Sequence, residues 1–471
     1  MVTCEFQLCH LWCRVAIATL SPRSVHKADV LYPGECDLNW SLAQREAHPS
    51  AGTLSCLAGA LGRPFCFSTA AGSRNMAEPT RIAIVHNRYL QSGGEDIVFR
   101  MEAELLASDG HTVLRYEYDN REVERLPPAV LACKTVWNAE AYSDLRERFA
   151  KDRPLVVHVH NTLPLVSPAV YAAARSSGAA VVQTLHNFRF LCPSATLYRN
   201  HHPCELCVGK KVPWPGVFYA CYRGSRAATG AVAAMLVTHR ARGTYRKEVD
   251  HYIALTDFAK RTFVRGGLPG DRITVKPNFA EDHDGGDYDA GAPLVSVGRL
   301  SDEKGIHVLA AAWQGAADLP CLRVVGDGPM RDTVEALAAR NPRVALIGRL
   351  PVDDVQREYR SASALVFAST CYESLPMTII EAYAAGLPVI AARLGAMAEV
   401  VHDGRTGLHF EPGNAEDLAR KIRWLRDRPD EARRMSVEAR REYERRYTPE
   451  RNLDQLLAIY QTAIERFRST R

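Results

Sequence analysis

Short apolar runs alternate with segments of helical periodicity twice along this 471-residue chain. The first series of predicted strands covers residues 81–85, 112–118, 155–160, 180–186, 252–255 and 273–276. The second covers residues 294–297, 322–325, 344–347, 364–368, 389–391 and 407–410. Strands that alternate with helices in this way favour parallel sheets with crossover helices. The sequence therefore predicts an α/β fold with two parallel-sheet domains.

The two series set the expected domain boundaries. We expect an N-terminal domain over residues 76–280, a linker over 281–292 and a second domain over 293–448. The glycines and aspartates of the linker indicate a solvated connection, because no buried strand precedes them as a metal-binding Asp-x-Asp motif would require. Residues 449–471 form a last helix that is long enough to cross back onto the first domain. Residues 1–75 lack sustained periodicity, and we expect a disordered tail or an extension ahead of a true start at Met76.

Composition excludes several classes of protein. The formal net charge is only +5 and no long basic arm is present, so nucleic acid is not an expected partner. No apolar run reaches membrane-spanning length. Most of the 13 cysteines are single and scattered, which is typical of reduced thiols in a cytoplasmic protein.

Two loops of the first domain carry candidate site residues. Gly93 and Gly94 follow the first strand, where their backbone N–H groups could approach a diphosphate closely. A plain turn explains a Gly-Gly pair equally well. His186 ends the strand 180–186 and faces the expected cleft, and we predict a functional role for it over the commoner structural one.

The second domain places charged residues after its strands. Glu373 follows the strand 364–368, and Glu381 lies in the first turns of the next helix. Ligands of open α/β sheets bind at the carboxyl ends of the strands, where two carboxylates can bind two sets of sugar hydroxyls. A favourable acid near a helix N-terminus explains Glu381 alone equally well. Arg299 and Lys304 follow the strand 294–297 and could stabilise a leaving diphosphate.

An insert over residues 192–226 contains Cys192, Cys204, Cys207 and Cys221. Four thiols, two of them in a Cys-x2-Cys pair, are the ligands of a closed structural zinc site, although unrelated thiols remain the alternative. Basic and aromatic residues alternate in the same insert, including Lys210, Lys211, Trp214, Phe218 and Tyr219. They suit a membrane interface or a polyanionic acceptor, and an ordinary solvated loop is the alternative.

Residues 81–468 together resemble the retaining glycosyltransferases of family 4, which have the GT-B fold of two Rossmann-like domains facing a cleft. The resemblance rests on Gly93-Gly94, on Gly298-Arg299 with Lys304-Gly305, on Gly326-Asp327-Gly328-Pro329, and on Glu373 seven residues before Glu381. The chain departs from the common family pattern at Ser374, where a glycine is usual, and this affects the sugar pocket rather than the phosphate site.

The resemblance implies a role for each matched residue. Glu373 would bind hydroxyls of the donor sugar and, with His186, act in catalysis. Glu381 would bind the nucleotide ribose. The remaining donor-binding residues would hold the diphosphate: Arg299, Lys304, Gly93, Gly94 and Gly326.

The implied activity is transfer of a sugar from a nucleoside-diphosphate sugar to a glycan or polyprenyl-linked acceptor. Retention of configuration, no cofactor beyond a possible structural zinc, and a place in surface polysaccharide or glycoconjugate synthesis are expected. The enzyme would be cytoplasmic, with peripheral contact to the inner membrane face. A nucleotide-sugar epimerase or phosphorylase on the same fold, and a non-catalytic zinc-stabilised glycan-binding module, are the alternatives.

Overall fold

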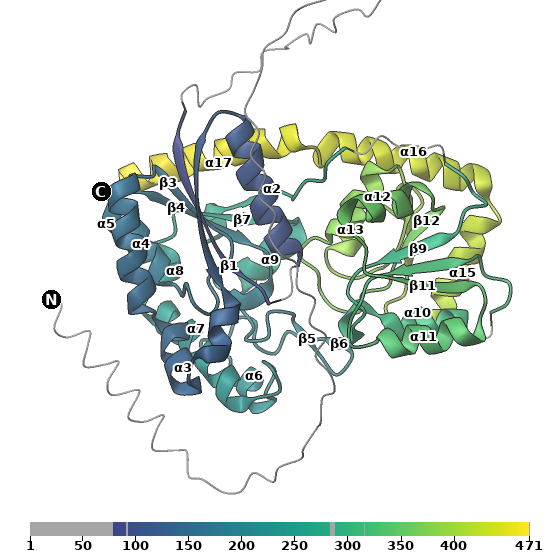
Figure 1. Ribbon diagram of the computed structural model, residues 1–471, viewed down its shortest axis with the longest axis horizontal. Helices are drawn as coiled ribbons and strands as arrows, with labels where there is room; N and C mark the ends of the chain where they lie inside the picture. Colours follow the sequence, from purple (N-terminus) through teal and green to yellow (C-terminus); the bar gives the residue numbers. More distant parts are fainter. Residues whose placement is uncertain (1–78, 91–92, 283–287, 315, 471) are drawn as a thin grey trace, which may run out of the picture. The chain divides into compact units, whose positions relative to one another are not determined.

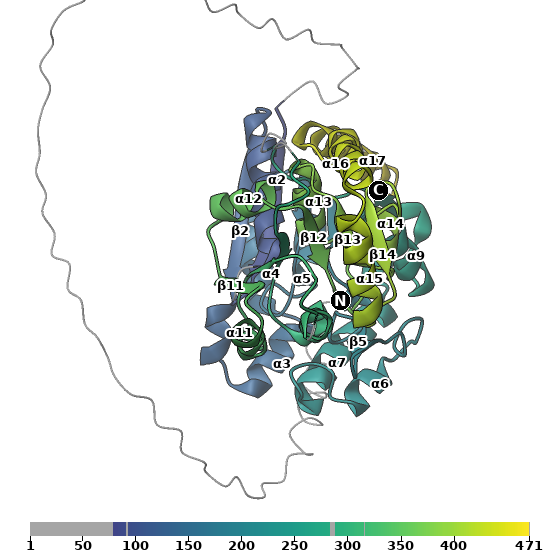
Figure 2. The same cartoon turned by 90° about the vertical axis from the view of Figure 1, so that its right-hand side faces the viewer.

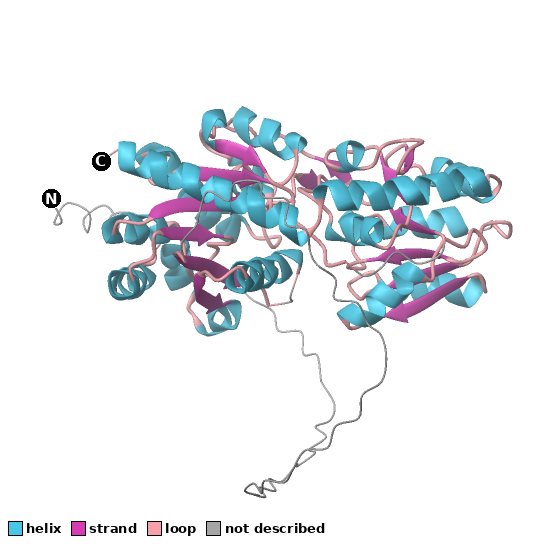
Figure 3. Ribbon diagram, turned by 90° about the horizontal axis from the view of Figure 1, so that it is seen from above, coloured by secondary structure: helices cyan, strands magenta, loops and turns pink. Residues whose placement is uncertain are grey.

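The computed structural model describes residues 79–90, 93–282, 288–314 and 316–470. The predicted extension over residues 1–75 lies outside the described residues, as does the middle of the predicted linker. The described residues form two six-stranded parallel sheets with helices packed on them (Figures 1 and 3). The predicted GT-B arrangement of two Rossmann-like sheets is confirmed.

The first sheet has the strand order β2-β1-β3-β4-β7-β8. Its strands are β1 (Arg81–Arg88), β2 (Thr112–Asp119), β3 (Val156–Val159), β4 (Ala180–Leu185), β7 (His251–Ala254) and β8 (Ile273–Val275). β3, β4 and β7 are buried along their full length, as expected for parallel strands with both faces covered. β1 continues three residues beyond its predicted end, because Asn87 is buried and donates to Asn120 Oδ1 at 2.7 Å.

Eight α-helices accompany the first sheet within the described part of the chain. They are α2 (Gly94–Ser108), α3 (Pro128–Val136), α4 (Ala139–Asp152), α5 (Ala169–Ser177), α6 (Trp214–Phe218), α7 (Arg226–Arg242), α8 (Thr244–Lys247) and α9 (Asp257–Arg265). Short 3-10 turns are η1 (Asn120–Arg125), η2 (Phe188–Phe190) and η3 (Gly270–Arg272). α5 begins at Ala169, because Ser167 has a positive φ and Pro168 is the N-cap.

The second sheet has the order β11-β10-β9-β12-β13-β14, in which the direction of progression reverses between β9 and β12. Its strands are β9 (Leu294–Val297), β10 (Leu322–Val325), β11 (Val344–Gly348), β12 (Ala364–Phe367), β13 (Val389–Ala392) and β14 (Gly407–Phe410). Its helices are α10 (Ile306–Trp313), α11 (Arg331–Arg340), α12 (Val352–Arg360), α13 (Met377–Ala384), α14 (Met397–Val400), α15 (Ala415–Arg426) and α16 (Pro429–Arg446), with η4 (Asp302–Lys304). α15 lies beside β13 and β14 (Figure 2).

The last helix, α17 (Pro449–Ser469), crosses back to the first sheet as predicted. It packs against β4, β7 and α2, and Figure 1 shows it leaving α16 for the first domain. Asn452 Nδ2 donates to the carbonyl of Pro277 at 2.8 Å, and the hydroxyl of Tyr460 shares a 2.9 Å hydrogen bond with His158 Nδ1. The C-terminal helix therefore joins the two domains through buried polar contacts.

The insert after β4 has little regular structure. Its elements are the two-residue strands β5 (Tyr198–Arg199) and β6 (His202–Pro203) and the five-residue helix α6. The insert ends where Ser225 caps the first turn of α7 by accepting a hydrogen bond from Ala228 N.

Candidate functional site

The point where the second sheet reverses brings two predicted site loops together. Parallel sheets bind ligands in the crevice at such a reversal. The loop after β9 carries Arg299 and Lys304, and the loop after β12 carries Glu373. Lys304 Nζ lies 2.6 Å from Glu373 Oε1, and the Ser369 hydroxyl donates to the same oxygen at 2.8 Å. The structure thus places a cation and a carboxylate in direct contact at the crevice.

The charges of this pair are set by their surroundings. The Lys304 and Glu373 side chains are 32% and 15% exposed. Burial lowers the pKa of the Lys304 ammonium, but its neighbours, Glu373 foremost, together outweigh that effect, and the pKa of Lys304 is raised overall. Arg299 is exposed, and its guanidinium makes no hydrogen bond or ion pair with the part of the chain that the structure describes. Two positive groups therefore lie in this loop, one held by Glu373 and one free to bind an anion.

Glycines allow the loops to approach this closely. Gly305 has φ +72°, and a Cβ on it would lie 1.9 Å from the carbonyl oxygen of Ala368. Gly326 has φ +143°, and its Cβ would lie 1.8 Å from the carbonyl oxygen of Gly298. Both positions require glycine for backbone packing alone. Gly326 packs against Gly298, which precedes Arg299. Its role in donor binding stays a prediction.

Glu381 lies in the second turn of α13 and has its own partner. The Tyr359 hydroxyl, on α12, donates to Glu381 Oε2 at 3.0 Å. Burial raises the pKa of Glu381, and the hydrogen bond from Tyr359 lowers it by less. At the start of the same helix, the buried hydroxyl oxygens of Ser374 and Thr378 have no hydrogen-bond partner among the described residues. Acceptors and donors for a polar ligand are therefore available around the first turns of α13.

The glycine pair of the first domain faces this helix start. Gly93 precedes α2, and its N–H donates to Asp96 Oδ2 at 2.8 Å. A Cβ on Gly94 would lie 3.6 Å from Met377 Cγ, at the first residue of α13. Asn278 Nδ2 also lies 3.5 Å from Met377 Sδ. The first domain therefore approaches the second at the predicted phosphate end of the site.

His186 is half-buried and contacts a buried histidine, His160. His186 Nε2 and His160 Nδ1 share a hydrogen bond of 2.9 Å. Burial lowers the pKa of both imidazoles well below the ordinary value, and neighbouring histidines lower it further. Both rings are therefore neutral at neutral pH. His186 can position a ligand by hydrogen bonding, and its neutral ring is a poor proton donor.

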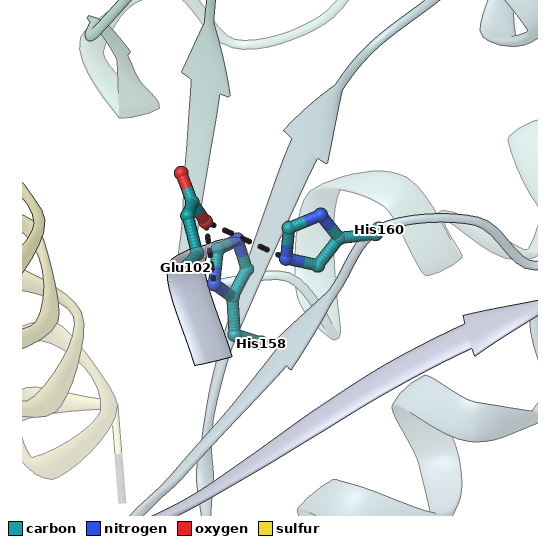
Figure 4. A group of neighbouring side chains, drawn as sticks. All are labelled: Glu102, His158 and His160. Atoms are coloured by element: carbon teal, nitrogen blue, oxygen red, sulfur yellow. Dashed lines mark ion pairs between the residues drawn. The ribbon is translucent and has the colours of Figure 1, made fainter. Parts of the chain in front are cut away.

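Behind His186 lies a charged cluster that the sequence did not indicate. Glu102, His158 and His160 form this cluster (Figure 4). One possible metal-ligand atom from each residue lies within 4.8 Å of those of the other two, and no other such group of His, Cys, Asp or Glu occurs among the described residues. Glu102 Oε2 lies 3.5 Å from His160 Nε2 and 3.8 Å from His158 Nδ1. Lys276 Nζ contacts Glu102 Oε1 at 2.6 Å in a fully buried pair. This ammonium already neutralises the carboxylate, so the cluster is an ion-paired core behind the cleft.

The insert contacts the second domain next to Lys304. The Tyr198 hydroxyl donates to Asp302 Oδ2 at 2.7 Å, and His201 Nδ1 contacts Asp302 Oδ1 at 2.8 Å. Thr370, in the loop after β12, donates to the Tyr198 hydroxyl oxygen at 3.3 Å. Sequence reasoning missed Asp302, whose only signal is its place inside the Gly298–Gly305 loop. The insert therefore forms one wall beside the Lys304–Glu373 pair.

The four cysteines of the insert line one small cavity. Burial raises the pKa of the Cys207 thiol to about 11, and the nearby thiols of Cys192, Cys221 and Cys204 raise it as well. Burial and the neighbouring thiols of Cys192 and Cys204 also raise the pKa of Cys221. Zinc binding by these four thiols stays a prediction.

Two family models match the chain. The "Glycosyl transferase 4-like domain" matches residues 93–278, and "Glycosyl transferases group 1" matches residues 292–428. Together they span more than half of the sequence, and each covers most of one sheet. The chain belongs to glycosyltransferase family 4. The predicted family is confirmed, and residues 279–291 separate the two matches.

Curated relatives of this family match parts of the chain. Sulfoquinovosyl transferase SQD2 of Arabidopsis thaliana is 34% identical over 160 residues, which cover 33% of this chain and 30% of that protein. The 2-deoxystreptamine glucosyltransferase of Streptomyces kanamyceticus is 27% identical over 307 residues, which cover 62% of this chain and 73% of that protein. The match to an uncharacterized glycosyltransferase of Methanocaldococcus jannaschii covers 49% of that protein. The chain thus spans half or less of several of these relatives.

Solved structures confirm the fold. HepE of Anabaena, in complex with UDP, aligns with a TM-score of 0.56 at 16% identity over 83% of this chain and 100% of that chain. Sucrose-phosphate synthase of Thermosynechococcus elongatus aligns with a TM-score of 0.58 at 17% identity over 82% and 99%. Among the described residues, no helix combines the length and apolar character needed to span a membrane.

Proposed function

We propose that this family 4 protein transfers a sugar from a nucleoside-diphosphate sugar to an acceptor hydroxyl, with retention of configuration and without a divalent cation. The observation that carries the proposal is the Lys304–Glu373 contact of 2.6 Å at the reversal of the second sheet, with the free guanidinium of Arg299 in the same loop. Family membership and the structural likeness to HepE bound to UDP support a nucleotide-sugar donor.

Each residue then has a defined task. Arg299 and Lys304 bind the diphosphate, and their charge stabilises the negative charge that develops as the bond from the anomeric carbon to the diphosphate oxygen breaks. Glu373 accepts hydrogen bonds from hydroxyls of the transferred sugar, and Glu381 accepts them from the ribose. The acceptor oxygen bonds to the anomeric carbon on the face that the diphosphate leaves. Its proton passes to a diphosphate oxygen, so no protein base is needed.

The first domain completes this arrangement. Gly93 and Gly94 place the start of α2 opposite Met377, where a backbone without side chains allows close approach to phosphate. Neutral His186 forms a hydrogen bond with the transferred sugar, and its contact with His160 fixes the orientation of its ring. The donor is therefore enclosed between the two domains, which lowers water access to the reacting bond.

Substitution of Lys304 tests this assignment. We expect Lys304→Met to lower turnover by about 10²–10³-fold, because one cation of the diphosphate site is lost. UDP serves as the probe for binding by calorimetry, and release of nucleoside diphosphate from a panel of nucleotide sugars reports turnover. Lys134→Met is the matched control, because Lys134 also pairs with a glutamate, Glu140, but on α3 and α4. Equal UDP affinity and turnover in both variants would refute the site.

Product analysis separates the alternative activities. Nuclear magnetic resonance of the product should show the same anomeric configuration as the donor. If the protein converts the sugar of the donor when no acceptor is present, the activity is that of an epimerase instead. Turnover that persists after brief treatment with EDTA is expected, since Arg299 and Lys304 supply the charge that a divalent cation would otherwise provide.

We further propose that the acceptor is a glycan or lipid-linked intermediate at the cytoplasmic membrane face, where the protein binds peripherally. The insert exposes aromatic rings, with Trp214 at 58% and Phe218 at 59%. Cations lie over them: Lys210 Nζ is 5.9 Å from the Trp214 ring centre, and the Arg226 guanidinium is 5.9 Å from that of Phe218. Aromatic rings beside cations suit an anionic lipid surface.

A cavity beside this part of the insert offers a second possible contact for the acceptor. It has a volume of about 580 Å³ and its lining includes Lys210, Lys211, Val212, Arg240 and Arg246. This volume lies within the range of small-molecule sites, roughly 300–1,000 Å³. A mixed apolar and cationic lining fits a phosphate-bearing lipid better than a neutral sugar.

Vesicle binding tests the membrane contact. The protein should sediment with vesicles of anionic phosphatidylglycerol and much less with neutral phosphatidylcholine. A Trp214→Ala, Phe218→Ala variant should lose most of this binding. Val352→Ala is the control, because Val352 is 62% exposed but lies on α12 of the second domain. Equal sedimentation of all three proteins would refute the contact.

A further inference from the structure

Four thiols from separate parts of the insert converge on one cavity. Cys192 follows η2, Cys204 and Cys207 follow β6, and Cys221 follows α6. The cavity that they line has a volume of about 10 Å³. This is close to the roughly 10–15 Å³ that one water-sized occupant requires. The site therefore has room for a single ion and not for a multinuclear cluster.

The same segment lacks the usual means of holding its shape. Its strands have two residues each and its helix has five. Of the eight non-glycine residues with positive φ in the described part of the chain, six lie here: Ala195, Leu197, Asn200, His201, Ala220 and Arg223. A left-handed conformation strains each such residue, because its Cβ lies close to the following carbonyl oxygen. Small segments without a large core are commonly held by disulfides or metals.

An orphaned donor points to negative charge in this cavity. Arg199 lines the cavity, and its Nε is buried without a hydrogen-bond partner among the described residues. Its guanidinium lies 4.0 Å from the centre of the Tyr219 ring, which also lines the cavity. A site of four thiolates around a divalent cation carries a net charge of −2. Arg199 is placed to donate to such a site and to offset its charge.

We propose that Cys192, Cys204, Cys207 and Cys221 bind one Zn²⁺ as thiolates in a closed tetrahedral site. Four sulfur ligands favour zinc over the harder divalent cations, and four protein ligands leave no position for substrate. No three of these sulfurs lie within 4.8 Å of one another in the structure, so the side chains rotate inward on binding. The ion is structural and takes no part in chemistry.

Zinc would act on the cleft through the wall that the insert forms. Tyr198 lies between Cys192 and Cys204 in sequence, and it contacts Asp302 two residues before Lys304. A fixed insert therefore holds Tyr198 and His201 against the second domain. This consequence rests on the proposed function, whereas zinc binding itself does not.

Metal analysis of the full-length protein tests the site. The protein is incubated with zinc chloride and passed through gel filtration, after which elemental mass spectrometry should show one zinc bound per chain. X-ray absorption at the zinc edge should show four sulfur ligands, with zinc–sulfur distances of about 2.3 Å. Cys207→Ser should lose one zinc per chain relative to the unaltered protein. Cys321→Ser, which changes an exposed cysteine outside the insert, should lose none. Iron in place of zinc, nitrogen or oxygen ligands, or no loss in Cys207→Ser would overturn the proposal.

A second measurement does not depend on any variant folding. Removal of zinc by a chelator should increase tryptic cleavage after Arg199, Lys210 and Lys211, while cleavage in the second domain stays unchanged. Unaltered cleavage within the insert after complete zinc removal would overturn the assignment. Because neither readout involves sugar transfer, this proposal and the proposed activity can fail separately.

Discussion

Glu381 shows how one residue of the site differs from an ordinary helix carboxylate. It is half-buried on α13, and its one hydrogen-bond donor among the described residues is the neutral Tyr359 hydroxyl. Burial raises its pKa, so the ionised form costs stability in the empty site. A ribose with two hydroxyl donors would compensate for this cost when nucleotide binds. The carboxylate is therefore better placed for a ligand than for the stability of the helix.

Glu381→Gln should stabilise the fold and weaken nucleotide binding. Because the folded pKa of Glu381 is raised above the unfolded value of about 4.5, its contribution is favourable below that value and is lost as pH rises through the folded value. Glutamine removes the charge and should raise Tm at pH 8, with the difference from the unaltered protein shrinking toward pH 5. UDP affinity at pH 8 should fall about tenfold, as for loss of one charged hydrogen bond of about 1.5 kcal/mol.

Thermal unfolding at several pH values and calorimetry with UDP check this prediction. Glu335→Gln, a change to an exposed glutamate on α11, is the control and should leave both properties nearly unchanged. A lower Tm in Glu381→Gln at pH 8, or unchanged UDP affinity, would contradict the assigned role.

The residues of the site were partly predictable. Glu373, Arg299 and Lys304 each follow a buried strand of the second sheet, so their place at the strand ends follows from the pattern of apolar runs. Tyr359 was not predictable, because its contact with Glu381 depends on how α12 packs beside α13. Side-chain partners across elements follow from three-dimensional packing, which spacing in the sequence does not determine.

At the level of elements, the start of α9 is closed by a residue of the second domain. The N–H groups of Asp257 and Phe258 each donate to the Glu399 carboxylate at 2.7 Å. Thr256, the N-cap, accepts from Ala259 N at 3.2 Å and donates to the carbonyl of Ser374 at 3.1 Å. A carboxylate at a helix N-terminus satisfies free donors and interacts favourably with the helix dipole. This helix end therefore joins the two domains.

Glu399→Ala should destabilise the protein and weaken the contact between its domains. Two N–H groups of α9 lose their acceptor, and we expect a loss of about 2 kcal/mol in the free energy of unfolding. Urea denaturation measures this loss. UDP affinity should also fall, because Thr256 at the same helix start contacts Ser374, which lies just before α13 and its Glu381. Glu411→Ala removes an exposed glutamate that pairs with Arg393 on the same domain and serves as control. An equal effect in both variants would rule out the joining role.

Elements differ in how well the sequence indicates them. β9 and β14 have the bounds predicted from their sequence, and β9 lies between Pro293 and Gly298, residues that interrupt regular structure. Helices α3, α4, α7 and α16 were not predicted. α7 is rich in alanine and has little amphipathic pattern, and α16 is dominated by arginine and glutamate. Where small or charged residues replace the apolar stripe, periodicity gives no signal.

For the whole molecule, the buried contacts of α17 connect the end of the chain to the first sheet. Tyr460 bonds His158, which lies beside the Glu102–Lys276 pair, and His158 Nε2 contacts the Thr184 hydroxyl at 2.7 Å. The first domain is therefore complete only when residues more than 300 positions apart meet. The crossing of this helix could be predicted from its length and position, and its buried polar partners could not.

Buried histidines should make the protein sensitive to acid. Burial lowers the pKa of His158, His239 and His251 to about 4, and that of His160 and His186 well below 6.5. The unfolded chain takes up these protons near pH 6.5, whereas the native protein does not, so stability falls as pH drops from 6.5 toward 4. One such histidine contributes a loss of up to roughly 3 kcal/mol at pH 4.

Urea denaturation at pH 8, 6.5 and 5.5 measures this dependence above the range in which most carboxylates titrate. The raised pKa values of Glu381, Glu95, Glu248 and Asp250, also caused mainly by burial, act in the opposite direction and offset part of the loss. We expect a lower free energy of unfolding at pH 5.5 than at pH 8, because the five histidines outweigh these four carboxylates in that window. His202→Gln changes an exposed histidine and should keep the same slope. Stability that is constant or rises on acidification would show that these rings are accessible to protons in the native protein.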